Sequence, residues 1–288
     1  MQYKQYECVH EFYDATCSVL MRHEARNIIP LGNIIIGKDD NDKTGWRDPA
    51  NWFMATVSND SGVALTAIMT PPHNLAISAA DNIINMDAIA CLIDNIADYP
   101  IPGVLAVKEM AQCFANVYAA KHQKTIKIEM DQRVYELTEV NPNVQKIGEL
   151  RLVDERDMSF FPFWLEAFAH EGFYGDDKMP LPMNEGLYQY HIHSKRCYVL
   201  EVDGLPVSLV GFSREMATVV GVGRVFTPPY FRGRGYASSA VAQLSQIALD
   251  KGFEKCVLYT NLDKPTPNSI YPKIGYVAIC DSLMIKFV

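Results

Sequence analysis

The sequence predicts an α/β fold of the α+β type, in which a mixed, mostly antiparallel central sheet is flanked by helices. Three observations support this prediction. Segments with strand and helix periodicity alternate along the 288 residues. Short turn signals such as Asp203-Gly204 join neighbouring strands as hairpins. The first half of the chain follows an order of elements similar to that of the second, so we expect two domains, 1–140 and 141–288, that meet near Asn141-Pro142-Asn143.

The second half shows the clearer pattern. Asp157 is expected to cap a helix that runs through Phe168, and another helix is expected over 184–194. The helix that begins after Gly235 has apolar residues at helical spacing and ends at Gly252. A short helical stretch is predicted over 268–273, shortened by prolines 267 and 272. The predicted strands span 149–153, 197–202, 206–214, 218–226, 255–260, 276–279 and 283–287.

The first half repeats this outline less clearly. Helices are predicted over 12–26, 81–98 and 108–121, and the helix over 81–98 has an apolar side. The predicted strands span 52–58, 63–69, 75–78, 103–107, 125–130 and 133–137.

Composition narrows the function classes. The chain carries 26 Lys and Arg against 34 Asp and Glu, a net charge of −8, whereas a general nucleic-acid binder usually has a basic excess. Residues 1–140 hold 11 basic against 18 acidic side chains, and residues 141–288 hold 15 against 16, so most of the acidity lies in the first half. We therefore expect no nucleic-acid partner.

Location and metal content follow from similar observations. The chain has no run of about 18 apolar residues, and its first residues lack the layout of a signal peptide. The seven cysteines are odd in number and include no C-x-x-C pair, so neither a disulfide framework nor a zinc site is predicted. We expect a cytoplasmic protein without membrane contact or bound metal.

The most informative segment spans residues 225–237, where a strand leads through a glycine-rich loop into a helix. The first backbone amides of a helix have no intrahelical acceptor, and the helix dipole adds positive potential there. Gly233 and Gly235 let the backbone approach a ligand closely, and Arg232 and Arg234 add positive charge. The segment therefore predicts an anion site suited to phosphate.

This segment also has other interpretations. The chain has neither a complete G-x-G-x-x-G fingerprint nor a complete G-x-x-x-x-G-K-[ST] motif, which excludes the usual dinucleotide and P-loop motifs. A single Arg-Gly tract in an acidic chain is a weak nucleic-acid signal. A surface turn with two solvated arginines remains an alternative.

The segment Arg232-Gly233-Arg234-Gly235-Tyr236-Ala237 resembles the acyl-CoA-binding loop of the GCN5-related N-acetyltransferase (GNAT) superfamily. The stretch 259–276 is similar to a second motif of that superfamily, with Tyr271 four residues before Gly275-Tyr276. The resemblance covers about half of the chain. It implies an acyl-CoA N-acyltransferase-like fold in the second half, and the first half is interpreted as a degenerate copy of that fold or an accessory domain.

The resemblance also implies roles for individual residues. Backbone groups of Val225, Phe226 and Thr227 would pair with pantetheine, and the amides from Arg232 to Ala237 would hold the pyrophosphate of acetyl-CoA. Tyr271 would protonate the departing thiolate, although it could instead be a core aromatic residue. Lys264 stands where the superfamily usually has asparagine, so Asn261 or Asn268 is expected to supply that amide.

The sequence does not single out a general base. The strand 219–226 contains no carboxylate, and the other candidates are Glu171, Glu185, Glu201, His170 and His191, or a chain of water molecules.

The leading hypothesis is an acetyl-CoA-dependent N-acetyltransferase that acts on an amine of a small molecule or peptide by direct attack. The acidic first half hints at a cationic acceptor. The alternatives are a non-catalytic acyl-CoA sensor and an interaction module. The oligomeric state, the acceptor and the natural acyl chain are left undefined.

Overall fold

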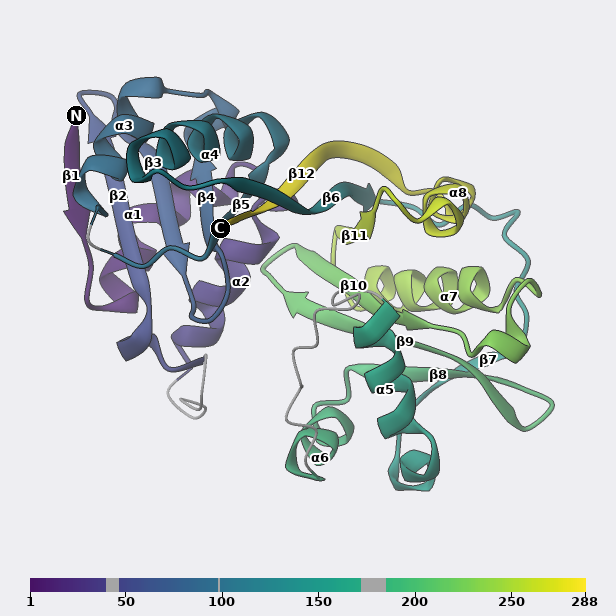
Figure 1. The fold of residues 1–288 in the computed structure, drawn as a ribbon. Coiled ribbons are helices and arrows are strands. Elements are labelled where there is room, and N and C mark those ends of the chain that lie inside the picture. The colour runs from purple at the N-terminus through teal and green to yellow at the C-terminus, as the bar shows by residue number, and fades with distance from the viewer. Residues whose placement is uncertain (40–46, 98, 172–184) are drawn as a thin grey trace. The chain divides into compact units, whose positions relative to one another are not determined.

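The protein is described by a computed structural model that covers residues 1–39, 47–97, 99–171 and 185–288. Its chain divides into two compact units. Unit 1 comprises Met1–Val134 together with Ile279–Val288, and unit 2 comprises Tyr135–Ala278 (Figure 1). The sequence predicts a boundary between residues 140 and 141, six residues after the observed one. It does not predict that the last ten residues, Ile279–Val288, fold with the first half of the chain.

Unit 1 is built on a sheet in the order β1-β2-β3-β4-β5-β12-β6. Its neighbours pair antiparallel in β1–β2, β2–β3, β3–β4 and β5–β12, whereas β4 and β5 are parallel. Its elements are β1 (Gln2–Gln5), α1 (Val9–Met21), α2 (Ile28–Gly37), β2 (Phe53–Asn59), β3 (Gly62–Met69), β4 (Leu75–Ala79), α3 (Met86–Asn95), β5 (Gly103–Val107), α4 (Lys108–His122), the first part of β6 (Ile126–Leu137) and most of β12 (Val277–Phe287).

Unit 2 follows the same plan, with its strands in the order β7-β8-β9-β10-β11-β6. Adjacent strands from β7 to β10 are antiparallel, and β10 and β11 are parallel. Its elements are β7 (Glu149–Leu152), η4 (Glu155–Ser159), α5 (Phe161–Ala169), α6 (Glu185–His193), β8 (Cys197–Val202), β9 (Leu205–Glu215), β10 (Val219–Phe226), η6 (Pro229–Phe231), α7 (Tyr236–Asp250), β11 (Lys255–Asn261) and α8 (Pro265–Ile274). The structure thus confirms a mixed, mostly antiparallel sheet flanked by helices.

Successive side chains along each strand of unit 2 point to opposite faces of the sheet, so a hydrophobic core forms on each face. Tyr198 and Leu200 of β8 pack in a cluster with Leu244 of α7 and Ile274 of α8. Cys197 and Val199, from the other face of the same strand, pack with Phe161 and Leu165 of α5. The sheet therefore has an α7–α8 face and an α5 face.

Several local predictions need correction. Asp157, predicted to cap the helix through Phe168, is buried within η4; the N-cap of that helix, α5, is Phe160, and η4 is capped by Asp154, whose side chain accepts a hydrogen bond from the Arg156 amide. Helix α2 was missed, because its sequence IIPLGNIIIG resembles a buried strand with a turn. At the end of each half of the chain, two consecutive strands are predicted, within 125–137 and within 276–287. Each pair is one continuous strand in the structure, β6 and β12 respectively.

Helix α8 is longer than expected and spans Pro265–Ile274. A first-turn amide has no intrahelical acceptor, so prolines there remove no hydrogen bond, and only Pro272 lies in the helix interior. Asn184, expected to begin helix α6, lies outside the described residues.

Candidate active site

Strand β10 separates from its parallel neighbour β11 partway along its length. The register between the two strands runs from Val219 opposite Lys255 to Gly221 opposite Val257. Beyond that point β10 continues to Phe226 in register with β9. In the described part of the chain, the end of β10 therefore has one strand partner, and its other edge is available to an extended ligand.

A bulge marks the place where the strands separate. The register with β9 shifts between Gly223 and Phe226, and Arg224 has a φ of 52°, a conformation that non-glycine residues adopt rarely. The Ser208 hydroxyl on β9 donates to the Phe226 carbonyl at 3.1 Å and contacts the Thr227 hydroxyl at 2.8 Å. These contacts hold the end of β10 on β9. Sequence reasoning missed the bulge, because strand pairing determines it and residue periodicity does not.

The loop after β10 presents the start of α7 in an open setting. Gly233 and Gly235 have φ values of 76° and 81°, which only glycine adopts at little cost. A Cβ atom on Gly233 would meet no other atom within 4 Å. Gly235 is the N-cap of α7 and makes no side-chain cap, so the amides of Tyr236 and Ala237 begin the helix without an intrahelical acceptor. The anion site predicted from the sequence falls on this loop and stays a prediction.

The two arginines of the loop differ in their surroundings. Arg232 donates from Nε to the Thr227 carbonyl and from Nη2 to both carboxylate oxygens of Glu171, all at 2.8 Å. The Arg234 guanidinium lies 5.2 Å from the centre of the exposed Tyr230 ring. The expectation that both arginines simply add positive charge was therefore too simple, because an anion near Arg232 has to compete with Glu171.

Two side chains of α7 fix this helix to the segment before β7. The Ser239 hydroxyl accepts from the Ile147 amide and donates to the Ile147 carbonyl, both at 2.9 Å. Gln243 accepts from the Leu150 amide at 3.2 Å and donates to the Gly148 carbonyl at 3.3 Å. The helix N-terminus is thus held by neutral hydrogen bonds that leave its positive potential intact.

Tyr271 lies in α8 and is buried on the α7–α8 face of the sheet. Its ring centre is 6.1 Å from that of Tyr135 and 5.9 Å from that of Tyr276. Burial, followed by the nearby Tyr135, raises the pKa of Tyr271 above its ordinary value. The phenol therefore stays protonated, as a proton donor must, while its ring also contributes to the core.

Asn268 connects the end of β11 to the start of α8. Its Nδ2 donates to the Asn261 carbonyl at 2.9 Å and to the Lys264 carbonyl at 2.8 Å. Its Oδ1 accepts from the Thr260 hydroxyl at 2.6 Å and from the Tyr135 hydroxyl at 3.4 Å. Both ends of the Asn268 amide are engaged within unit 2, so a cofactor would have to displace one of these partners to contact it.

Asn261 caps the turn that follows β11. Its Oδ1 accepts from the Asp263 amide at 2.8 Å. This leaves Asn261 as the remaining amide candidate for a cofactor contact.

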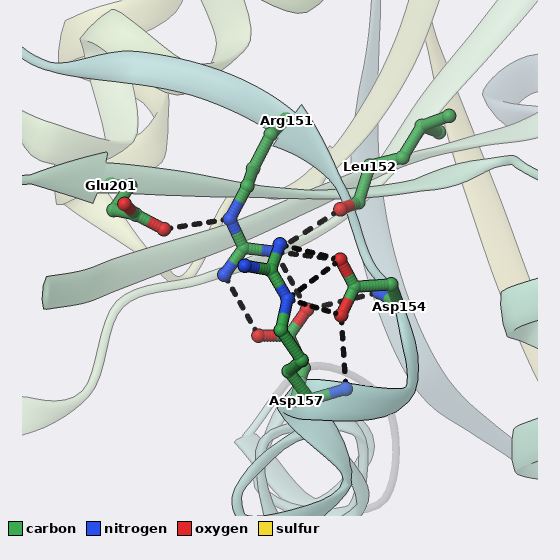
Figure 2. Close-up of polar contacts among 6 residues, drawn as sticks. Arg151, Leu152, Asp154, Asp157 and Glu201 are labelled. Atoms are coloured by element: carbon green, nitrogen blue, oxygen red, sulfur yellow. Dashed lines mark hydrogen bonds and ion pairs between the residues drawn. The ribbon is translucent and has the colours of Figure 1, made fainter. Parts of the chain in front are cut away.

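Glu201 is part of a structural ion-pair cluster. Arg151 on β7 binds Glu201 at 2.6 Å and both oxygens of the buried Asp157 at 2.8 and 2.9 Å (Figure 2). The cluster joins β7, β8 and η4. Glu201 and Glu171 are thus both engaged by arginines, Arg151 and Arg232, so a substrate would have to compete with these arginines to reach either carboxylate.

His191 is the best placed of the remaining candidate bases. Its Nδ1 lies 3.9 Å from the Sγ of Cys197, and its ring stands edge-on to Phe161 at 6.3 Å. This position puts His191 on the α5 face of the sheet. His170 is exposed at the end of α5, and the Glu185 side chain lies outside the described residues.

The equivalent loop of unit 1 lacks these features. Strands β4 and β5 are also parallel there, but the helix that follows β4 begins at a capped end, where Asn85 Oδ1 accepts from the Ala88 amide at 3.0 Å. The preceding turn carries Asp81, which pairs with Arg22 at 2.7 Å. A capped helix end beside a carboxylate does not favour an anion.

Unit 2 thus has two parallel strands that separate, followed by a helix whose N-terminus has no side-chain cap. Residues 158–276 match the model of the acetyltransferase (GNAT) family. The chain therefore contains a domain of the acetyltransferase (GNAT) family in unit 2.

Solved structures extend the likeness to both units. A Drosophila protein covers 99% of this chain and 98% of its own length, with a TM-score of 0.66 at 11% identity. A GCN5-related N-acetyltransferase from Sphaerobacter thermophilus covers 99% and 95%, with a TM-score of 0.64 at 12% identity. A GNAT-family acetyltransferase from Colwellia psychrerythraea covers 100% and 99%, with a TM-score of 0.59 at 11% identity. At these identities the likeness establishes the fold.

A search of curated proteins found no significant match. Among the described residues, no helix is long and apolar enough to cross a membrane, and the described part of the chain has no group of three or more His, Cys, Asp or Glu side chains arranged to hold a metal ion.

Proposed function

We propose that unit 2 is an acetyl-CoA-dependent N-acetyltransferase. The observation that carries this proposal is the combination of a β10 edge separated from β11 and an uncapped α7 that begins at Gly235. Pantetheine would pair with the backbone of Val225–Thr227. The pyrophosphate would lie against the amides from Arg232 to Ala237.

In the proposed reaction, the acceptor amine attacks the acetyl carbonyl carbon directly. The new C–N bond forms as the C–S bond breaks, backbone amides near Phe226 stabilise the developing oxyanion, and the Tyr271 phenol gives its proton to the CoA sulfur. The amine proton passes to His191 or through water. His191 is assigned this role because it lies on the α5 face beside Cys197.

The reaction is tested by incubating the full chain with acetyl-CoA and a panel of amines. Free CoA and acetylated amine should form in equal amounts. Chromatography is preferable to a thiol reagent, because the chain itself has seven cysteines. A chain that binds acetyl-CoA tightly but acetylates no amine would contradict the proposal.

A non-catalytic acyl-CoA sensor is the second candidate. The burial of Tyr271 among Tyr135 and Tyr276 favours it, because a ring used only for packing would be placed in this way. The sensor requires saturable acetyl-CoA binding, no acetylated product, and no effect of Tyr271→Phe beyond stability.

A further inference from the structure

The side chain of Asn268 uses every hydrogen-bonding position that an amide has. Its two N–H groups donate to two backbone carbonyls, those of Asn261 at 2.9 Å and Lys264 at 2.8 Å. Its oxygen accepts from two hydroxyls, those of Thr260 at 2.6 Å and Tyr135 at 3.4 Å. A terminal amide offers two N–H donors and two lone pairs, so this side chain is satisfied in one orientation.

These hydrogen bonds tie helix α8 to the end of strand β11. Thr260 and Asn261 are the last two residues of β11, and Lys264 is the N-cap of α8. The register of β11 with β10 ends at Val257. Asn268 therefore fastens α8 to the part of β11 that lies beyond its pairing with β10.

Tyr271 lies one helical turn after Asn268, between two points at which α8 is held. Residues three apart in a helix lie on the same side of it. At the end of the helix, the Asn141 backbone amide donates to the Ile274 carbonyl at 2.8 Å, and the Asn141 Nδ2 donates to the Lys273 carbonyl at 2.9 Å. The start of α8 is held by the Asn268 amide, so a loss of that amide frees one end of the helix that carries Tyr271.

Helix α8 depends on such outside contacts because its own backbone hydrogen bonding is incomplete. Pro272 has no N–H, so the helical hydrogen bond that would run from it to the Asn268 carbonyl does not form. A proline also disfavours the helical conformation of the residue before it, which here is Tyr271. The helix has only 10 residues, a length at which an isolated helix is marginal in water. The orientation of Tyr271 is therefore set by what holds α8 from outside.

We propose that Asn268 is a positioning residue, whose amide fastens α8 to β11 and thereby directs the Tyr271 phenol at the departing thiolate. Thr260, the closest of its four partners, supports Asn268 in turn. This inference rests on the proposed N-acetyltransferase function, in which Tyr271 gives its proton to the CoA sulfur. It gives Asn268 a role in the transfer step and no direct contact with acetyl-CoA.

The test measures the single-turnover rate of acetyl transfer by the full chain, with the enzyme in excess over acetyl-CoA and with the amine of the panel that is acetylated fastest. Asn268→Ala should lower this rate by about 10-fold or more, because a misplacement of about 1 Å can cost about 100-fold in rate. In the Tyr271→Phe background, the same substitution should lower the rate by less than about 2-fold, since the group that it positions is already absent. The Kd for acetyl-CoA should stay within about 2-fold of the wild-type value.

Thr260 offers a milder variant, which keeps the test decisive if Asn268→Ala does not fold. Thr260→Val retains the shape of the side chain but lacks the hydroxyl that donates to Asn268. It should lower the single-turnover rate by about 3- to 10-fold, the effect of one hydrogen bond, and only when Tyr271 is present. Thr260→Ser keeps the hydroxyl and should retain most of the wild-type rate.

Asn95 in unit 1 provides the matched control. Its Nδ2 donates to the Cys91 carbonyl, four residues earlier, at 2.8 Å, and the Asn268 Nδ2 donates to the Lys264 carbonyl at the same spacing and distance. Asn95→Ala removes this local hydrogen bond far from Tyr271 in the sequence and should leave the transfer rate unchanged.

The possible outcomes separate this inference from the proposed function. An equal loss of rate with and without the Tyr271 hydroxyl, or no loss at all, would overturn the inference and leave the N-acetyltransferase function standing. A Kd for acetyl-CoA that rises by about 10-fold or more in Asn268→Ala, the effect of a lost hydrogen bond to a ligand, would make Asn268 a cofactor contact and overturn its positioning role. Acetyl-CoA binding without acetylation of any amine would overturn both proposals.

Discussion

At the residue scale, Gly233 offers the cleanest test of the anion site, because α7 provides a matched control at its other end. Gly233 and Gly252 have φ values of 76° and 96°, and a Cβ on either would meet no atom within 4 Å. Substitution by Asp therefore imposes a similar backbone cost at both positions. Gly233→Asp also places a carboxylate where we expect phosphate. We predict that it weakens acetyl-CoA binding by about 10-fold or more, through charge repulsion, as measured by isothermal titration calorimetry.

Gly252→Asp should bind acetyl-CoA with wild-type affinity. If both variants lose the same affinity, the effect comes from helix stability and the loop is not the binding site.

Tyr271 allows the proton-donor role to be separated from its packing role. Tyr271→Phe keeps the buried ring and removes the hydroxyl, so we expect kcat to fall by about 10- to 100-fold, the range for loss of a general acid, with little change in KM for acetyl-CoA. Tyr135→Phe is the matched control, since its ring is the buried neighbour of Tyr271. Equal kcat values in steady-state assays of the wild type and Tyr271→Phe would assign Tyr271 to the core alone.

The raised pKa of Tyr271 gives this role a pH signature. A phenol whose pKa lies above its ordinary value stays protonated to higher pH. The activity that depends on it should therefore persist past about pH 10, the ordinary tyrosine pKa, and decline only beyond it. A decline in kcat near neutral pH that Tyr271→Phe abolishes would contradict a buried proton donor.

Individual residues differ in how far the sequence could predict them. The glycine-rich turn at Gly233 and Gly235 was predictable, because two closely spaced glycines directly before a helix are typical of a loop that lets the backbone approach an anion. Arg224 was not, since its position depends on a bulge set by the pairing of β9 with β10. For Asn268 the sequence could not separate a ligand contact from a structural link, because an asparagine has the same sequence signal in both roles.

At the scale of elements, Arg151 holds β7, β8 and η4 together. Removal of one member of a buried pair leaves the other uncompensated, at a cost of about 3–5 kcal/mol. The Asp157 side chain is 2% exposed, whereas Glu201 is 33% exposed. We therefore expect Arg151→Met to reduce the free energy of unfolding of unit 2 by about 2–4 kcal/mol, measured by hydrogen exchange of β8 and β9 amides.

Arg156 is the control for this cluster, because it is exposed and pairs with Asp154 at the surface. Arg156→Met should leave the exchange rates of β8 and β9 unchanged. Similar exchange rates in the Arg151→Met variant and the wild type would show that the cluster contributes little to stability.

The elements themselves were predictable where the periodicity was clear, as in β8, β9 and α7. Errors arose where tertiary contacts overrode local signals. Helix α2 has an isoleucine-rich sequence that a strand could share, and α8 tolerates Pro265 because the first helical turn needs no amide hydrogen bond.

At the scale of the whole molecule, the end of the chain completes unit 1. Residues 282–286 of β12 pair antiparallel with residues 107–103 of β5, and Leu283 and Ile285 are each 1% exposed in the core of unit 1. We predict that Leu283→Ala destabilises unit 1 by about 2–5 kcal/mol, because it leaves a cavity in a packed core. Hydrogen exchange of β5 amides measures this loss, and β9 amides of unit 2 should keep their protection.

Val277→Ala is the control on the same strand, since Val277 is 65% exposed. If Leu283→Ala leaves β5 protected, the C-terminal strand is not an integral part of unit 1. The sequence could not predict this arrangement, because the pairing joins residues that lie far apart in the chain.

The central claim is that acetyl-CoA binds at the α7 loop of unit 2 and that the equivalent loop of unit 1, with its capped helix and Asp81, does not bind it. Isothermal titration of the full chain with acetyl-CoA tests this most directly, because it counts sites. We predict a stoichiometry of about one acetyl-CoA per chain, as expected for one uncapped, glycine-lined helix N-terminus. A stoichiometry of about two would show that unit 1 also binds the ligand, and no binding at all would contradict the acyl-CoA site itself.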